Sequence, residues 1–112
     1  MAQTVIPVIL TDKVAIVTGA SRGLGAQIAQ QMAAAGASIC VNYLNSKEAA
    51  EKVVADIKAA GGQAFAYQGD VTDLSQMQAM AAEVIKHFGR IDILINNALP
   101  SYSQFKIKAI RL

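Results

Sequence analysis

The sequence contains one cysteine, Cys40, one histidine, His87, and no tryptophan. A single cysteine excludes a disulfide within the chain, and one cysteine with one histidine cannot form a metal site of those residue types. We therefore expect no metal centre, and Cys40, inside an apolar run, is expected in the core. Charged residues make up only 16% of the chain and hydrophobic residues 54%, which excludes intrinsic disorder.

An excess of charge of one sign is also missing. The formal net charge is +2, and three of the ten basic residues, Lys106, Lys108 and Arg111, lie in the last twelve positions. Everything before them carries 7 basic against 8 acidic residues. A near-neutral body excludes nucleic acid as the main partner, because such proteins need a clustered basic face.

A segment that could cross a membrane is absent from the N-terminal end. The opening MAQTVIPVIL is apolar, but it has no basic leader and is too short for a bilayer. We expect a cytoplasmic protein with no membrane partner.

What the chain does contain is an alternation of short apolar runs and helical patterns. Its 112 residues allow one domain. We predict strands at Val14–Val17, Ile39–Tyr43, Ala64–Tyr67 and Ile91–Ile95. Between them lie helical patterns that end at Gly36, Gly61 and Gly89. Short strand–helix connections predict an α/β fold, a doubly wound parallel sheet with helices on both faces.

Two helix starts carry capping signals. Asn45 or Ser46, with Glu48 in the first turn, predicts a capping box, and Asp73 with Gln76 predicts another. A favourable Glu48–Lys52 pair is expected on the exposed side of the second helix. The third helix is expected to bury the apolar positions Leu74, Met77, Ala81, Val84, Ile85 and Phe88.

Glycines are concentrated between the first strand and the first helix. Gly19, Gly23 and Gly25 form the pattern T-G-x-x-x-G-x-G. Glycine lets the backbone turn sharply and approach a pyrophosphate, and the helix N-terminus offers free N–H groups to it. The alternative is a tight turn that binds no ligand. A Walker phosphate loop is excluded, because no Gly-Lys-Ser/Thr follows.

Three motifs together resemble a known family. TGASRGLG (18–25), GDVTD (69–73) and INNA (95–98) are similar, in this order, to the N-terminal half of the short-chain dehydrogenases/reductases. The likeness covers about residues 12–98, and the stretch 41–62 looks most like the 3-oxoacyl-acyl-carrier-protein reductases. It implies a Rossmann-like sheet of order 3-2-1-4, truncated after the fourth strand, so that residues 1–112 form a single, partial dinucleotide-binding domain.

The resemblance also implies a cofactor site at the carboxyl ends of the strands. Gly19, Ser21, Arg22, Gly23, Leu24 and Gly25 would line the pyrophosphate and ribose. Asp70 and Val71 would flank the adenine, and Asn97 and Ala98 would lie near the nicotinamide-side ribose.

The end of the second strand favours NADP(H) over NAD(H). An NAD site places an acid there for the ribose 2′-OH, whereas this chain has Asn42 and Tyr43 and no carboxylate until Glu48. Arg22 and Ser46 can instead bind a 2′-phosphate.

The last segment, 99–112, departs from the family pattern. Leu99 follows Ala98 where the family has glycine, and the catalytic Ser and Tyr-x-x-x-Lys pair are expected beyond the fourth strand. Tyr102 and Lys106 have the right spacing, but they lie too early and such a pair arises readily by chance, so we expect no catalytic role for them.

The function expected from these features is NADP(H)-dependent hydride transfer between an alcohol and a carbonyl, with a 3-oxoacyl thioester as the substrate class. Acyl carrier protein is a possible partner, and the chain carries the cofactor-binding half only. The alternatives are a non-catalytic dinucleotide-binding or interaction module and a fragment without function. We also expect a homo-oligomer, and self-association of this chain through the apolar edge Ile91–Asn97.

Overall fold

A computed structural model describes residues 9–98, and the expected tail at 99–112 lies outside the described residues. The elements in chain order are β1 (Val14–Val17), α1 (Gly23–Ala34), β2 (Ser38–Tyr43), α2 (Lys47–Ala59), β3 (Gln63–Gln68), α3 (Leu74–Phe88) and β4 (Ile93–Ile95). The strands form one parallel sheet of order β3-β2-β1-β4. This confirms the predicted fold class and strand order.

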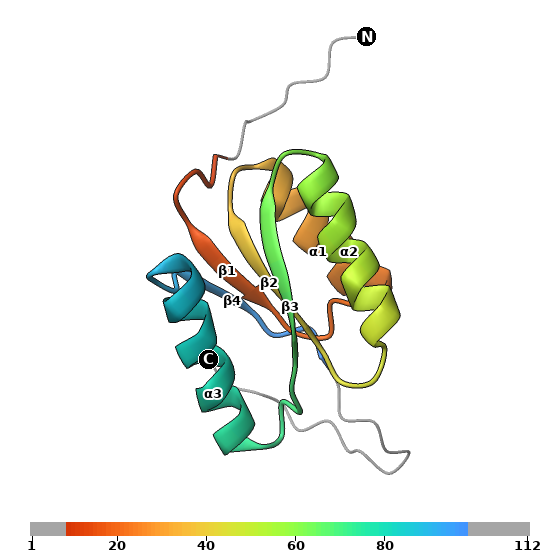
Figure 1. Cartoon of the computed structure of the whole chain (residues 1–112), viewed down its shortest axis with the longest axis vertical. Coiled ribbons are helices and arrows are strands. Elements are labelled where there is room, and N and C mark those ends of the chain that lie inside the picture. Colours follow the sequence, from red (N-terminus) through yellow and green to blue (C-terminus); the bar gives the residue numbers. More distant parts are fainter. Residues whose placement is uncertain (1–8, 99–112) are drawn as a thin grey trace, which may run out of the picture.

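The sheet lies between two helical layers. Figure 1 shows α1 and α2 on one face and α3 on the other. Ile39, Val41 and Tyr43 of β2 belong to the cluster that includes Val53, Val54 and Ile57 of α2. Cys40, from the opposite face of β2, packs with Val14, Ile16, Met80 and Val84. Burial on both faces explains why β1 is apolar at all four positions.

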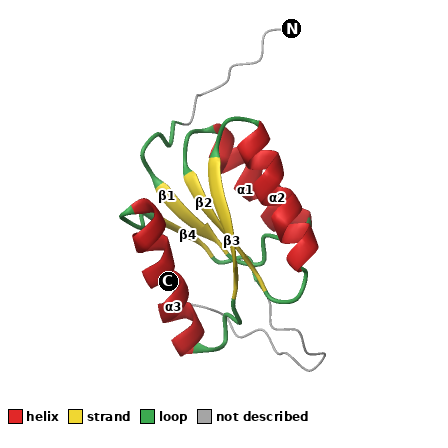
Figure 2. Ribbon diagram, viewed as in Figure 1, coloured by secondary structure: helices red, strands yellow, loops and turns green. Residues whose placement is uncertain are grey.

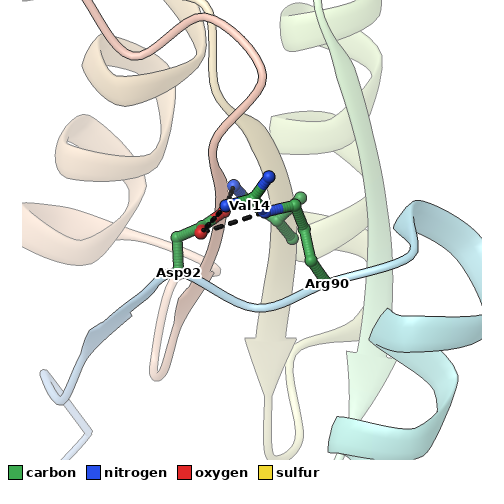
Figure 3. A network of polar contacts seen from close by, with 3 residues as sticks. All are labelled: Val14, Arg90 and Asp92. Carbon is green, nitrogen blue, oxygen red and sulfur yellow. Dashed lines mark hydrogen bonds and ion pairs between the residues drawn. The ribbon is translucent and has the colours of Figure 1, made fainter.

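The fourth strand is shorter than predicted, because Asp92 makes side-chain contacts at its entrance. Asp92 Oδ2 accepts a hydrogen bond from Val14 N–H at 2.9 Å, and Arg90 Nη2 lies 2.6 Å from Asp92 Oδ1 (Figure 3). The backbone N–H of Asp92 donates in return to the carbonyl of Val14 at 2.9 Å. The paired register therefore begins with Ala15 opposite Ile93, and Ile91 packs beside the α3 cluster.

The two predicted capping boxes have different outcomes. Asp73 accepts from Gln76 N–H at 3.2 Å, as predicted, although Gln76 Oε1 accepts from Asp70 N–H and not from Asp73. In α2 the N-cap is Ser46, and it makes no side-chain capping bond within the described residues. Its hydroxyl instead accepts from Arg22 Nη2.

The exposed pair in α2 and the buried side of α3 also differ from expectation. Lys52 pairs with Asp56 at 3.1 Å, and no Glu48–Lys52 pair forms in the described structure. Val84 of α3 is buried as predicted, together with Met80, which was not predicted, whereas Leu74 is 72% and Ile85 52% exposed.

Candidate functional site

The loops that follow the four parallel strands gather at one end of the sheet (Figure 2). They surround a cleft of about 510 Å³. The cleft is lined by Gly19, Ser21, Leu24, Asn42, Leu44, Asn45, Ser46, Gly69, Asp70, Val71, Thr72, Asn97 and Ala98. An open α/β sheet typically binds ligands at this edge.

The β1–α1 turn needs its glycines for two different reasons. Gly19 and Gly23 have φ of +59° and +61°, a left-handed conformation that side chains disfavour. Gly25 lies at a close approach: a Cβ there would come within 2.4 Å of the Gly19 carbonyl oxygen and 2.6 Å of Asn97 Nδ2. Arg22, the N-cap of α1, makes no side-chain capping bond within the described residues. The first N–H groups of α1 are thus left for a ligand or water.

Thr18 ties this turn to the end of β4. Its hydroxyl oxygen accepts from Asn97 N–H at 2.9 Å and Ala98 N–H at 3.0 Å. Asn97 Nδ2 also donates to the Gly19 carbonyl at 3.1 Å. Our prediction from the sequence did not assign Thr18, although it is the threonine of the T-G-x-x-x-G-x-G pattern.

Asn42 is buried at the end of β2, and its side chain contacts the backbone on both sides. The amide oxygen accepts from Gly19 N–H at 3.2 Å, and Nδ2 donates to the carbonyls of Tyr67 and Gly69. Tyr43, the neighbouring residue, points to the other face and lies in the core with 7% exposure.

A charged hollow adjoins the cleft beyond β2. It is lined by Arg22, Asn45, Ser46, Lys47, Glu48 and Ala49. Arg22 Nη2 donates to the Ser46 hydroxyl, which links the glycine turn to the start of α2. The charged residues of this hollow are the cations Arg22 and Lys47 and the carboxylate Glu48. Lys47 was not predicted as a site residue from the sequence.

On the far side of the cleft, Asp70 is held as a carboxylate. Its Oδ1 accepts from the Thr72 hydroxyl at 2.7 Å and from Thr72 N–H at 2.8 Å. These two bonds lower the pKa of Asp70 below its ordinary value. Asp70 is therefore an acceptor at neutral pH.

The structure brings most of the predicted cofactor residues together. Nine of them line the cleft: Gly19, Ser21, Leu24, Asn42, Ser46, Asp70, Val71, Asn97 and Ala98. Arg22 lies in the adjoining hollow, and Gly23 and Gly25 lie in the first turn of α1. Tyr43 does not reach the cleft, while Tyr102 and Lys106 lie outside the described residues.

Residues 9–98 hold no group of three or more His, Cys, Asp and Glu side chains placed to bind a metal ion. None of the helices described is long and apolar enough to cross a bilayer.

The sequence and the structure of the chain are similar to those of known proteins. The family model described as short chain dehydrogenase matches residues 13–106. The chain is 52% identical over 86 residues to the 3-oxoacyl-[acyl-carrier-protein] reductase FabG of Staphylococcus aureus, which covers 77% of this chain and 35% of that protein.

Two solved structures are similar in both sequence and shape. A short chain dehydrogenase from Burkholderia cenocepacia in complex with NADP is 46% identical with a TM-score of 0.76, covering 80% of this chain and 36% of that one. A 7α-hydroxysteroid dehydrogenase complexed with NADH and 7-oxo glycochenodeoxycholic acid is 43% identical with a TM-score of 0.74, covering 79% and 34%. The chain thus spans about a third of the length of these relatives. With a family model that matches most of its residues, the chain belongs to the short-chain dehydrogenase family.

Proposed function

We propose that this chain binds NADP(H) in the cleft, as the cofactor-binding part of an oxidoreductase that transfers a hydride between the cofactor and a carbonyl or alcohol carbon. The observation that carries the proposal is the β1–α1 turn, which places an uncapped helix N-terminus behind two left-handed glycines. A bound nicotinamide would donate the hydride to a carbonyl carbon or accept it from an alcohol carbon, and the residues of this chain would bind and orient the dinucleotide.

A pyrophosphate suits the space in front of α1. Gly25 lets the first turn of α1 pack directly against the Gly19 turn and Asn97, because a side chain there would clash with both. The free N–H groups and the positive end of the helix dipole both favour a bound anion. Gly19, Ser21, Gly23, Leu24 and Gly25 are the residues we assign to it.

The charges beyond β2 favour NADP(H) over NAD(H). Arg22 carries a planar guanidinium suited to a phosphate, and Ser46 and Lys47 lie beside it. The first carboxylate, Glu48, belongs to α2 and does not end the strand. We assign the adenine to Asp70 and Val71, and the nicotinamide-side ribose to Asn97 and Ala98.

The substrate class we propose is a 3-oxoacyl thioester carried by acyl carrier protein or coenzyme A. The 52% identity to a 3-oxoacyl-[acyl-carrier-protein] reductase supports this class. A homo-oligomer in the cytoplasm, acting in fatty acid synthesis, belongs to the same proposal. No tyrosine or lysine lines the described cleft, so we assign this chain cofactor binding and leave the proton-transfer step unassigned.

The test is a titration of the chain with NADPH and with NADH, followed by calorimetry or by the fluorescence of the reduced nicotinamide. Wild type is expected to bind NADPH more tightly than NADH. Arg22→Ala is expected to weaken NADPH binding roughly 10- to 150-fold, since a charge-assisted contact contributes roughly 1.5–3 kcal/mol, and to change NADH binding little. Lys58→Ala, which removes a charge from the exposed last turn of α2, is the control and should change neither.

Each result has a definite meaning. A wild-type chain that binds neither dinucleotide overturns the proposal and supports a fragment without cofactor function. Equal loss of both dinucleotides in Arg22→Ala overturns the NADP(H) preference alone. Binding without turnover of a 3-oxoacyl thioester is the outcome expected of this chain, to which we assign cofactor binding alone.

A further inference from the structure

The ends of β1, β2 and β3 are joined by one buried side chain. Asn42 is 1% exposed, and its Oδ1 accepts from Gly19 N–H at 3.2 Å. Its Nδ2 donates to the carbonyl oxygens of Tyr67 at 3.3 Å and Gly69 at 3.2 Å. Both amide hydrogens are therefore engaged with backbone, and neither is left to select a ligand.

The backbone around Asn42 is joined to the same two neighbours. The Asn42 carbonyl accepts from Ala20 N–H at 2.9 Å, and Gly69 N–H donates to the Tyr43 carbonyl at 2.9 Å. Side chain and main chain thus hold the glycine turn on one side of β2 and the end of β3 on the other. These are the two walls of the cleft, because Gly19 and Gly69 both line it.

The hydrogen-bond partners at position 42 require an amide side chain. The group must accept from one N–H and donate to two carbonyl oxygens inside the protein, which asparagine does and a carboxylate does not. A carboxylate here would face two carbonyl oxygens without a proton to donate. Alanine would leave the Gly19 N–H and two carbonyl oxygens without their side-chain partner, at a cost for each that stays buried.

We propose that Asn42 is a positioning residue, which sets the separation between the Gly19 turn and the end of β3 and so holds the cleft open for NADPH and NADH alike. The inference rests on the proposed function, since it assigns a role within the same dinucleotide site. It differs from a role in cofactor selection, because Asn42 is not among the residues that line the hollow beside Arg22.

The experiment compares wild type with Asn42→Ala and the milder Asn42→Ser. Their dissociation constants for NADPH and for NADH are measured well below the unfolding temperature of each variant. We expect Asn42→Ala to weaken both dinucleotides about ten-fold, the same factor for each, while Arg22→Ala changes the ratio between them. Asn42→Ser, whose hydroxyl can replace one of the bonds, should fall between wild type and Asn42→Ala.

A stability control separates positioning from folding. Val84 of α3 is fully buried against the sheet with Met80 and Cys40, so Val84→Ala lowers stability without touching the cleft. It should lower the unfolding temperature and leave both dissociation constants unchanged. If the Asn42 variants behave like Val84→Ala, with lower stability and unchanged affinity, the inference is wrong. A shift in the NADPH-to-NADH ratio also overturns it.

One measurement needs no variant. Amide hydrogen exchange in the ligand-free wild type should show slow exchange at Gly19 N–H, and exchange at the rate of an open loop would overturn the inference.

Absence of dinucleotide binding in wild type overturns the proposed function, and this inference with it. Unchanged affinity in the Asn42 variants of a wild type that binds overturns the inference alone.

Discussion

Substitution of Gly25 by alanine tests how closely the first turn of α1 approaches the strand ends. The added Cβ would lie 2.4 Å from the Gly19 carbonyl oxygen, 2.6 Å from Asn97 Nδ2 and 3.0 Å from the Cα of Ala20. The carbonyl oxygen and the Cα are backbone atoms, so a side-chain rotation cannot relieve the contacts. Either the turn moves away from α1 or the hydrogen bond from Asn97 to Gly19 breaks.

The magnitude follows from two opposing effects. Overpacking of a close contact costs typically about 1–3 kcal/mol, and we expect the upper end because the clash involves backbone. Alanine recovers up to about 1 kcal/mol in a helix relative to glycine. The net loss of about 2 kcal/mol lowers the unfolding temperature by roughly 8–16 °C in a domain of this size.

The control for Gly25→Ala is Gly61→Ala. Gly61 has φ +92° and open space around its Cβ position, so alanine there costs backbone strain of roughly 1–2 kcal/mol without a clash. Thermal unfolding and NADPH titration of both variants form the assay. Both should lose stability, and only Gly25→Ala should lose NADPH affinity. A Gly25→Ala chain that unfolds within about 2 °C of wild type, or binds NADPH like Gly61→Ala, refutes the reasoning.

Three further predictions concern other parts of the molecule. Hydrogen bonding from Arg90 lowers the pKa of Asp92 in the folded state. The contribution of Asp92 to stability is therefore present above the unfolded pKa of about 3.9 and is lost as the pH falls through the folded pKa. In melting curves, Asp92→Asn should lower the unfolding temperature at pH 7 and should flatten the decline of the unfolding temperature between pH 4 and 2. Burial raises the pKa of Cys40 to about 12, so a thiol reagent at pH 8 should label the chain only after denaturation, and rapid labelling of the native chain would contradict the buried position. Leu94 is 60% exposed on β4, which has one strand neighbour in the described sheet, so light scattering at tens of micromolar should show self-association that Leu94→Lys reduces; a monomeric wild type would exclude this edge as the contact.

Much of the fold was predictable because its signals are local. The bounds of β1 agree with the predicted Val14–Val17, since an apolar run followed by glycines marks a buried strand without reference to the rest of the chain. The parallel arrangement followed from the strand–helix alternation. The strand order, in contrast, came from the resemblance to a family, because spacing alone does not say which strands are neighbours.

The errors involve contacts between segments far apart in the sequence. The Ser46 hydroxyl makes no capping bond to α2 and accepts a hydrogen bond from Arg22, which lies 24 positions earlier. The third helix buries Met80, which was not predicted, beside the predicted Val84, and leaves the predicted Leu74 and Ile85 exposed. Its helical period allowed more than one apolar face, and only packing against the sheet selects between them.

The same limit explains the outcome at the end of β2. Adjacent residues of a strand point to opposite faces, but β2 is buried on both sides, so the pattern does not say which of Asn42 and Tyr43 faces the cleft. The structure places Asn42 at the cleft and Tyr43 in the core. A polar residue in an otherwise apolar strand was the available signal, because a buried amide must find partners.

Thr18 and Asn42 together hydrogen-bond to the backbone at the strand ends that surround the cleft. Parallel strands that end at one edge leave backbone groups there without partners in the ladder. The Thr18 hydroxyl accepts from the N–H groups of Asn97 and Ala98 at the end of β4. The Asn42 side chain bonds to the Gly19 N–H after β1 and to the carbonyl oxygens of Tyr67 and Gly69 at the end of β3. Two side chains thus join four strand ends. The conformational entropy of these strand ends is lost when the chain folds and not when a ligand binds. A ligand that enters a cleft ordered in this way loses less affinity to reorganisation, so the proposed dinucleotide binding should depend on polar residues beneath the surface as well as on those that contact the ligand.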